Sequence, residues 1–254
     1  MVGGRRAPMI AFRGPIRNIP ITKFSPAVAM GAATMAAERD DFSSKLEAAP
    51  DLKLPPKMVW VKGPDGKTMD ANSVGITFLQ KVERWLSILV YNSFITHIPS
   101  HVIRQSYLRL FGADIGKDSA VMRGTTVIDI KYLTIGNCTA IGSRCLLDAR
   151  GGLWIGDNVT IASDVHILGG GHDINDPDFL PVPIPTVIED YVWIASRAMI
   201  LPSHIRRGAV VAASSLVNKD VDELVVVGGI PAKPISKRNP DALKYSGKYR
   251  PIFH

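Results

Sequence analysis

Aliphatic residues recur every six positions through the second half of the chain. The first three are Ile115, Val121 and Val127, and two more such triplets follow after joins of eight residues: Ile135, Ile141, Leu147, Ile155, Ile161 and Ile167. Six residues are enough for one short strand and one turn, so three units return the chain to its starting side. The repeat predicts a triangular solenoid in which one aliphatic side chain per unit points inward and stacks on the next coil.

Residue types near these aliphatics fit tight corners. Small or β-branched residues stand two positions before many of them, and glycine follows several: Ser119, Thr125, Thr139, Cys145, Gly116, Gly136, Gly142 and Gly156. We expect Gly and Asn, such as Asn137 and Asn158, to take the left-handed conformation at the corners. Because each coil is buried only by its neighbours, the solenoid needs several coils and a cap at each end.

The ladder is interrupted in two places. Between Ile167 and Ile188 the spacing is 21 residues instead of six, which predicts an excursion loop over 168–187. Long ordered loops on a rigid scaffold often carry function. Four prolines are expected to keep the second half of this loop out of sheet pairing: Pro177, Pro181, Pro183 and Pro185. The unit after Ile200 lacks one residue near Ser203, so an irregular corner is expected there.

Other segments flank the predicted solenoid at 112–227. Residues 1–57 lack periodicity and are interpreted as a flexible leader, and 228–254 as a turn and a tail. Residues 58–111 are expected to form a strand and turn followed by a helical cap subdomain. The helix pair at 76–111 is apolar on one side and flanked by arginines. It has two interpretations: a subdomain packed on the end of the solenoid, or an interfacial helix that rests on a membrane.

Composition narrows the class of protein. The chain of 254 residues has a net charge of +7 and a pI near 9.5, which fits an anionic partner. Aromatic residues are few and do not interleave with basic ones, so nucleic acid is not expected. Two cysteines without a CxxC pair suit a reducing cytoplasm. No stretch is long and apolar enough for a membrane span, and the N-terminus lacks a signal peptide. We therefore expect a cytoplasmic protein, with membrane association as the alternative for 76–111.

The later coils carry recognisable motifs. VWIASRAMILPSHIRRGAVVAASSLVNKDV at 192–221, followed by GGIPAKPI, resembles the last coils of the hexapeptide acyltransferases, nearest to the maltose and galactoside O-acetyltransferase branch. DVHILGGGHD resembles their catalytic-loop entry. The resemblance covers 112–236 and implies a mainly β fold, a left-handed parallel β-helix, with acyl-CoA as donor and a homotrimer with active sites between subunits. The sequence departs from the motifs at Ala195, at Asn218 and at the short corner.

His172 is the candidate catalytic residue. Transfer of an acyl group to a sugar hydroxyl needs a base, because the alcohol attacks a thioester only as its proton leaves. Imidazole changes protonation state near neutral pH, and Gly169, Gly170 and Gly171 leave room for a substrate. The alternative interpretation of His172 is an exposed loop histidine without a catalytic role.

Two aspartates are candidates for binding the acceptor. In the resembling family an acidic residue near Asp148 binds acceptor hydroxyls, and the alternative role of Asp148 is to cap a corner. Asp173 either orients His172 or contacts the sugar, or only forms a turn.

The donor is expected to lie along the last coils. Ser196 with a neighbouring backbone N–H is a candidate for stabilising the thioester oxyanion. The family resemblance places Trp193 against the acyl-pantetheine arm, and Ala213 and Ser214 where backbone groups bind pantetheine. Basic residues cluster in this region, as expected for a cofactor with several phosphates: Arg206, Arg207, Lys219, Lys233 and Lys237.

Three classes of function follow. The first is a CoA-dependent O-acyltransferase that forms no acyl-enzyme, because Cys145 is expected to pack inside a corner. The second is a metalloenzyme of the γ-carbonic-anhydrase type, which needs three histidine ligands; the spacing supplies His166 and His172 without a third. The third is a non-catalytic scaffold. The first is favoured, with no metal site expected, while the acceptor and the acyl chain length stay open.

Overall fold

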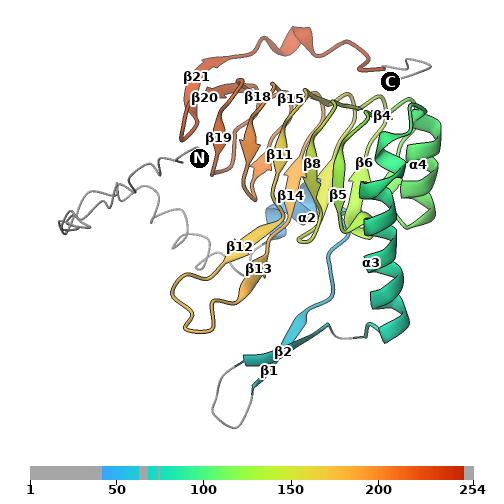
Figure 1. The fold of residues 1–254 in the computed structure, drawn as a ribbon. Coiled ribbons are helices and arrows are strands. Elements are labelled where there is room, and N and C mark those ends of the chain that lie inside the picture. The colour runs from blue at the N-terminus through green and yellow to red at the C-terminus, as the bar shows by residue number, and fades with distance from the viewer. Residues whose placement is uncertain (1–41, 63–67, 74, 249–254) are drawn as a thin grey trace, which may run out of the picture.

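The computed structural model describes residues 42–62, 68–73 and 75–248, and its main body is a solenoid of parallel β-strands (Figure 1). The strands form three sheets, one along each side of a triangular coil. The first sheet contains β3 (Asp114–Ile115), β6 (Leu133–Ile135), β9 (Leu153–Ile155), β14 (Thr186–Ile188) and β17 (His204–Ile205). The second contains β4 (Ala120–Val121), β7 (Ala140–Ile141), β10 (Thr160–Ile161), β15 (Trp193–Ile194), β18 (Val210–Val211), β20 (Val225–Gly228) and β21 (Lys233–Lys237). The third contains β5 (Thr126–Ile128), β8 (Leu146–Asp148), β11 (His166–Ile167), β16 (Met199–Ile200) and β19 (Leu216–Val217).

The repeating aliphatic residues form the core, so the predicted parallel β-helix is confirmed. Ile135 pairs with Ile155 in the first sheet, Ile141 with Ile161 in the second, and Leu147 with Ile167 in the third. All are almost completely buried. Identical positions of successive coils therefore stack on one another along the axis, which removes a continuous apolar column from water.

The first and second corners of each coil turn through one residue in the left-handed conformation. We call the passage from the first to the second sheet the first corner, from the second to the third sheet the second corner, and from the third sheet to the next coil the third corner. Left-handed residues of the first corner include Asp118, Cys138, Asn158 and Tyr191, and those of the second include Arg144, Asp164, Arg197 and Ser214. The expectation is correct for Asn158 and wrong for Asn137, whose side chain instead accepts from the Lys117 N–H at 2.9 Å.

The unit after Ile200 is indeed short by one residue. Ile205 follows Ile200 after five positions, yet β17 keeps the register of the first sheet, with Ile205 opposite Ile188. His204, beside this corner, is buried, and its Nε2 lies 2.6 Å from Oε1 of Glu189. The shortened corner therefore changes the local turn and leaves the stack intact.

Two helices cover the first coil. They are α3 (Phe78–Ser93), which begins with a capping box at Thr77, and α4 (His101–Leu110), joined by η1 (Ile95–His97). Their side chains satisfy backbone groups at the open edge of the first coil, which otherwise has no strand beside it. The Asn92 amide pairs with both the N–H and the carbonyl of Val127, and Arg104 and Gln105 donate to the carbonyls of Val121 and Ser119.

The N-terminal region is only partly described. The predicted leader 1–57 lies mostly outside the described residues. Within the described part, α2 (Ser43–Ala48) precedes a segment in which Ala49 and Leu52 pack on Val187 of the first sheet. The strand expected near residue 58 is β1 (Met58–Lys62), and it pairs antiparallel with β2 (Thr68–Ser73). The resulting hairpin projects away from the solenoid (Figure 1).

The chain returns along the solenoid after the last coil. β21 pairs antiparallel with β20, and η3 (Pro240–Ala242) follows. The segment beyond runs back over the coils toward the first ones (Figure 1), where the Gly247 N–H donates to Asn158 at 3.1 Å. η2 (Ile130–Tyr132) lies at the third corner of the first coil. None of the described helices is long and apolar enough to cross a membrane.

Candidate functional site

The predicted excursion leaves the coil at the third corner and forms a hairpin. β12 (Gly170–His172) pairs antiparallel with β13 (Pro181–Pro183), and we call residues 169–184 the His172 hairpin (Figure 1). The expectation that its prolines would prevent pairing is wrong. The Ile184 N–H donates to Gly169 and the Asp173 N–H to Leu180. Hydrogen-bonded pairs alternate with non-bonded ones in such a ladder, so the two prolines of β13 occupy positions that need no N–H.

The stem of the hairpin requires glycine. A Cβ on Gly169 would lie 2.5 Å from the carbonyl oxygen of Asp148 in the coil below. A Cβ on Gly151 would lie 2.2 Å from the carbonyl oxygen of Ile184, where the hairpin returns. Both strands of the stem therefore press directly on the preceding coil. This close contact fixes where the hairpin leaves the solenoid.

The imidazole of His172 is held by Phe179 across the hairpin. The two rings stack with centroids 4.3 Å apart and an interplanar angle of 8°. Nδ1 of His172 lies 2.8 Å from the carbonyl oxygen of Phe179. A carbonyl oxygen only accepts hydrogen bonds, so Nδ1 carries a proton, and in the neutral ring Nε2 keeps its lone pair. The side chain is exposed, and this tautomer presents a proton acceptor to a substrate.

Short-range hydrogen bonds shape the tip of the hairpin. Oδ1 of Asp173 accepts from the Asn175 N–H at 3.0 Å, which is the turn-forming role considered for it. Oδ1 of Asp176 accepts from the Asp178 N–H at 2.8 Å. The hydroxyl of Thr68, at the start of β2, donates to Oδ2 of Asp178 at 2.6 Å. The β1–β2 hairpin and the His172 hairpin are thus in direct contact.

Asp148 lies beneath the stem and pairs with Arg150. Its side chain is 1% exposed, and its two oxygens lie 2.9 and 2.7 Å from Nε and Nη2 of Arg150. Burial by itself raises the pKa of the Asp148 carboxyl. Hydrogen bonds from the Arg150 side chain and backbone outweigh burial and hold that pKa below its ordinary value. The carboxylate therefore bonds to both the side chain and the backbone N–H of Arg150 at this corner.

Ser196, Ala213 and Ser214 lie along the second corner in successive coils. The Ser214 N–H donates to the carbonyl of Ser196 at 3.0 Å, so these turns stack directly. Trp193 precedes them on β15 of the second sheet and is 45% exposed. The structure brings these four predicted residues to one side of the solenoid. Trp193 lies on the sheet opposite the third corner and the other three lie at the second corner, whereas the His172 hairpin leaves the coil at the third corner.

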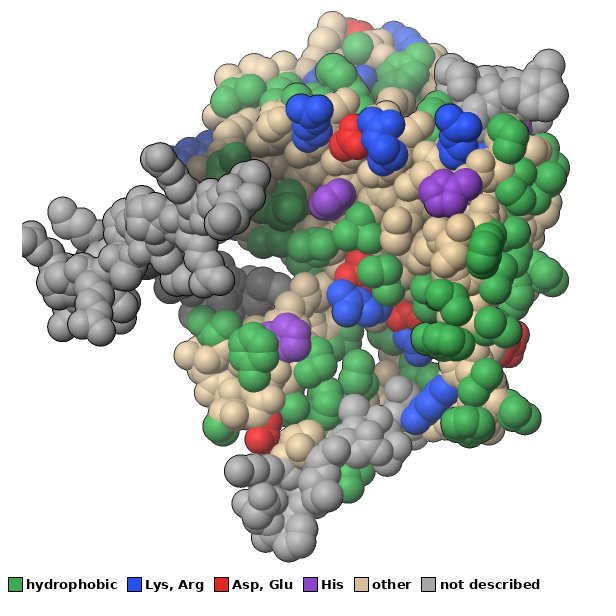
Figure 2. All heavy atoms as spheres, in the orientation of Figure 1, with side chains coloured by type: hydrophobic (Ala, Val, Ile, Leu, Met, Phe, Trp, Pro, Cys, Tyr) green, Lys and Arg blue, Asp and Glu red, His purple; other side chains and the backbone are tan. Residues whose placement is uncertain are grey.

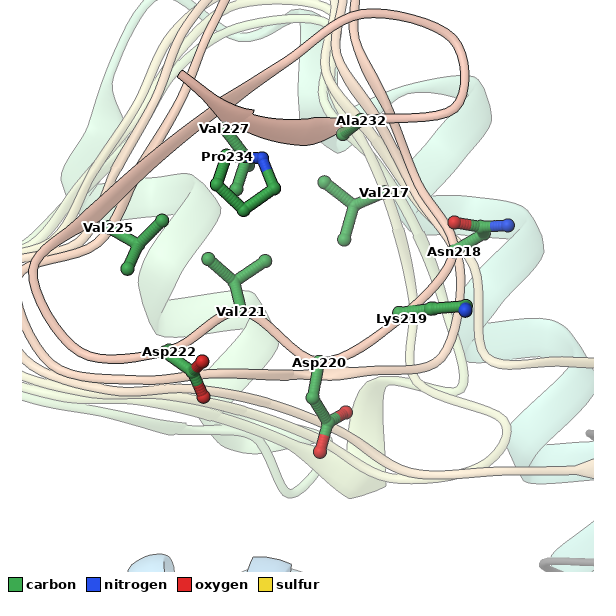
Figure 3. A pocket seen from close by; sticks show the side chains of 10 residues that line it. All are labelled: Val217, Asn218, Lys219, Asp220, Val221, Asp222, Val225, Val227, Ala232 and Pro234. Atoms are coloured by element: carbon green, nitrogen blue, oxygen red, sulfur yellow. The ribbon is translucent and has the colours of Figure 1, made fainter. Parts of the chain in front are cut away.

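The predicted basic residues do not form a single patch. Arg206 and Arg207 lie at the first corner and pair with Asp222 and Glu223 at 3.1 and 3.8 Å. Lys233 is exposed on β21, opposite Gly228. Lys219 stands at the rim of a pocket of about 140 Å³ in the open last coil (Figure 3). That pocket is lined mainly by aliphatic side chains, and the side chain of Lys219 points away from it.

Comparisons with known proteins place the chain in a family. No family model matches it. WcaF of Escherichia coli, described as a colanic acid biosynthesis acetyltransferase, is 32% identical over 136 residues, which are 53% of this chain and 75% of WcaF. The structure of a hexapeptide-repeat-containing acetyltransferase from Vibrio cholerae with acetyl-CoA superimposes with a TM-score of 0.57 at 26% identity, covering 66% of this chain and 93% of that one. The chain belongs to the hexapeptide-repeat acetyltransferases.

A second solved relative agrees with this assignment. A galactoside acetyltransferase in complex with coenzyme A is 25% identical with a TM-score of 0.55, covering 65% of this chain and 83% of that one. As a hexapeptide-repeat acetyltransferase, the chain is an acyltransferase.

Two further residues considered in this hexapeptide-repeat acetyltransferase, Cys145 and His166, lie on the third side of the solenoid. Burial raises the pKa of the Cys145 thiol to about 11, so the nucleophilic thiolate is scarce at neutral pH. His166 is exposed on the outside of the third sheet. Among the described residues, no group of three or more His, Cys, Asp or Glu side chains is placed to hold a metal ion.

Sequence reasoning missed three contacts around the site of this acetyltransferase. Arg150 pairs with Asp148, Phe179 stacks on His172, and Thr68 bonds to the hairpin tip. The sequence does indicate the pairing of Arg150 with Asp148, because Arg150 stands two residues beyond this acidic residue at the end of a strand. The other two contacts join residues that lie at no regular spacing, so the hexad pattern carries no information about them.

Proposed function

We propose that the chain transfers an acyl group, most simply acetyl, from acyl-CoA to a hydroxyl of a sugar or polysaccharide. The single observation that carries the proposal is the hydrogen bond between Nδ1 of His172 and the Phe179 carbonyl, which in the neutral ring leaves Nε2 as a proton acceptor on an exposed hairpin. The names of the relatives support the substrate classes: a colanic acid biosynthesis acetyltransferase and a galactoside acetyltransferase bound to coenzyme A.

The proposed reaction is a direct attack without an acyl-enzyme. Nε2 of His172 accepts the proton of the acceptor hydroxyl as that oxygen bonds to the thioester carbonyl carbon. The Phe179 carbonyl, bonded to Nδ1–H, stabilises the imidazolium that forms. Ser196 and its neighbouring backbone N–H stabilise the oxyanion. The carbon–sulfur bond then breaks, and the imidazolium returns its proton to the departing CoA thiolate, which restores the neutral base.

The proposed donor site follows the second corner. Pantetheine lies along Trp193, Ala213 and Ser214, which the backbone stacking aligns parallel to the solenoid axis. Lys219 and Lys233 are exposed and are the favoured partners of the CoA phosphates. Arg206 and Arg207 rank below them, because carboxylates already pair with both guanidinium groups.

The acceptor is proposed to lie at the tip of the His172 hairpin. Asp173 directly follows His172 there and is the favoured contact for sugar hydroxyls. Asp148 ranks second, because its carboxylate is buried and paired with Arg150.

The proposed assembly is a homotrimer with active sites between subunits. His172 extends from the third corner, while Trp193 lies on the opposite sheet and Ser196 at the second corner of the same solenoid. A neighbouring copy that sets its second corner against the His172 hairpin completes the site. The remaining proposed partners are acyl-CoA, the carbohydrate and, through residues 76–111, a membrane surface; the compartment proposed is the cytoplasm.

The test compares two histidine variants. His172→Ala is expected to lower the rate of acetyl transfer from acetyl-CoA by about 100-fold or more in a screen of sugars and oligosaccharides, the usual contribution of a general base. His166→Ala, which removes another exposed histidine of the same region, is the matched control and is expected to retain activity. Circular dichroism and light scattering establish that both variants fold and assemble alike. Full activity of His172→Ala would overturn the assignment.

A further inference from the structure

The cap formed by α3 and α4 has one face bonded to the solenoid and one apolar face directed outward. The inner face holds the side chains that bond to the first coil, among them Asn92 and Arg104. The outer face carries large apolar side chains at helical spacing, and we call this set the apolar plateau: Phe78, Leu79, Val82, Trp85, Leu86, Leu89, Phe94, Val102, Ile103 and Leu110. Apolar side chains gather over this end of the molecule in Figure 2.

The apolar plateau contains more large exposed apolar side chains than are expected from scattered surface residues. Leu79 is 78% exposed and Trp85 is 64% exposed. Single exposed apolar residues are ordinary, but nine on two adjacent helices, with Phe94 directly after the first helix, form a patch of the kind that marks an interaction surface. No element of the described part of the chain covers it.

Basic residues accompany the plateau. α3 and α4 contain a single acidic residue, Glu83, against four basic ones: Lys81, Arg84, Arg104 and Arg109. Arg84 is paired with Asp129 and Arg104 is buried, which leaves Lys81 and Arg109 at the surface. Lys131 adds another cation where the cap meets the coil, because its side chain lies against Gly112 at the end of α4.

We infer that the apolar plateau docks on the surface of an anionic phospholipid bilayer. Apolar helix faces flanked by cations bind such surfaces, and exposed Trp and Phe suit the headgroup level. Phe78, Trp85 and Phe94 supply these aromatics. A second copy of the chain is a weaker fit, because a symmetric contact through this end would bring the same basic flanks together.

The proposed function includes contact with a membrane through residues 76–111. Docking of the apolar plateau specifies which surface makes that contact and which class of lipid it binds. The inner face of the cap lies on the end of the solenoid, so the bilayer would meet that end and the coils would extend away from it. The His172 hairpin and the N-terminal end of α3 project beyond the same side of the solenoid (Figure 1). The inference rests on the proposed function only for its consequence, an acceptor presented at a membrane. Docking is measured without donor or acceptor, so its failure is distinguishable from failure of the reaction.

The test is vesicle flotation of the full chain. Vesicles of phosphatidylcholine with phosphatidylglycerol are expected to carry the protein upward at low salt, and vesicles of phosphatidylcholine alone to carry less. The double variant Leu79→Glu, Trp85→Glu places two charges on the plateau and is expected to lower the bound fraction about tenfold. Ile235→Glu is the matched control, since Ile235 is exposed to the same 64% as Trp85 but lies on β21. It is expected to bind like the unaltered chain.

Several outcomes would overturn the inference. One is an unaltered chain that stays unbound with both kinds of vesicle, and another is an equal loss in the double variant and in Ile235→Glu. Light scattering that shows end-to-end assemblies, dissolved by the double variant, would identify a second copy as the occupant. Binding that requires removal of residues 1–41 would identify that segment as the occupant.

Discussion

At the residue scale, the Asp148–Arg150 pair shows how one ion pair holds the stem of the His172 hairpin. Asp148 is almost completely buried directly below Gly169, where a Cβ would collide with it. Its charge is tolerated because the Arg150 guanidinium and backbone bond to it. Removal of the cation would leave a buried carboxylate without its main partner, which costs more than loss of a surface pair.

Arg150→Gln is therefore expected to lower the free energy of unfolding by about 1–2 kcal/mol at neutral pH, because Arg150 itself is partly solvated. The folded-state pKa of Asp148 lies below its ordinary value. The stabilisation is thus present above the unfolded pKa of about 4 and is lost as the pH falls through the lower folded value. Urea unfolding at neutral and acidic pH measures both effects, and the difference between variant and unaltered chain should shrink below about pH 4.

The control for this prediction is Arg144→Gln. Arg144 makes the same bidentate contact with Asp164, at 2.8 Å for both bonds, but at the exposed second corner. Arg144→Gln is expected to lower the free energy of unfolding by much less than Arg150→Gln, because water screens and replaces an exposed ion pair. Equal decreases in the free energy of unfolding in the two variants would show that burial of Asp148 does not strengthen its pair with Arg150.

The same scale shows the limit of sequence reasoning at the corners. The inward position of Ile141 or Ile161 follows from the six-residue spacing, because any other placement would expose an entire column. The left-handed residue does not follow from residue type: Arg144 and Tyr191 adopt this conformation, while Asn137 does not. The ladder on both sides dictates the backbone there, and it overrides the preference for Gly and Asn.

At the element scale, the solenoid was predictable and its attachments were only partly so. The excursion at 168–187 follows from a break in spacing, but its pairing depends on which positions lack a ladder bond. Pro181 and Pro183 alternate with a bonded position, so β13 forms despite them. The helical cap was predictable from its period. The side chains that join it to the first coil were not, because Asn92 and Val127 lie 35 residues apart without a shared pattern.

Asn92 gives the prediction that belongs to this scale. Asn92→Ala removes two hydrogen bonds to the edge of β5 at once and is expected to lower the free energy of unfolding by about 2 kcal/mol. Ser93→Ala, at the exposed neighbouring position, is expected to stay within about 0.5 kcal/mol of the unaltered chain. Hydrogen exchange adds a local measurement, since the Val127 N–H donates to Asn92 at 3.0 Å. Unchanged exchange at Val127 in Asn92→Ala would contradict a joining role for this side chain.

At the scale of the whole molecule, the candidate residues are divided between two sides of one solenoid. The His172 hairpin leaves at the third corner, and Ser196, Ala213 and Ser214 stack along the second. Spacing along the sequence predicts where each residue lies on a coil, but it holds no information about contacts between copies. If two copies complete each site, then a defect in one half of the site need not inactivate the half supplied by the other copy.

This division makes a complementation experiment decisive. His172→Ala removes the proposed base, and Ala213→Glu places bulk and negative charge where the anionic donor is proposed to lie. Each homotrimer is expected to be inactive, with acetyl-CoA shifting the melting temperature of the first and not of the second. In co-expressed mixed trimers, a site that draws His172 from one variant and Ala213 from the other is intact. Random assembly makes about a quarter of the sites intact in a cyclic trimer, so about that share of the activity should return. Mixed trimers without activity would place both halves of the site in one chain.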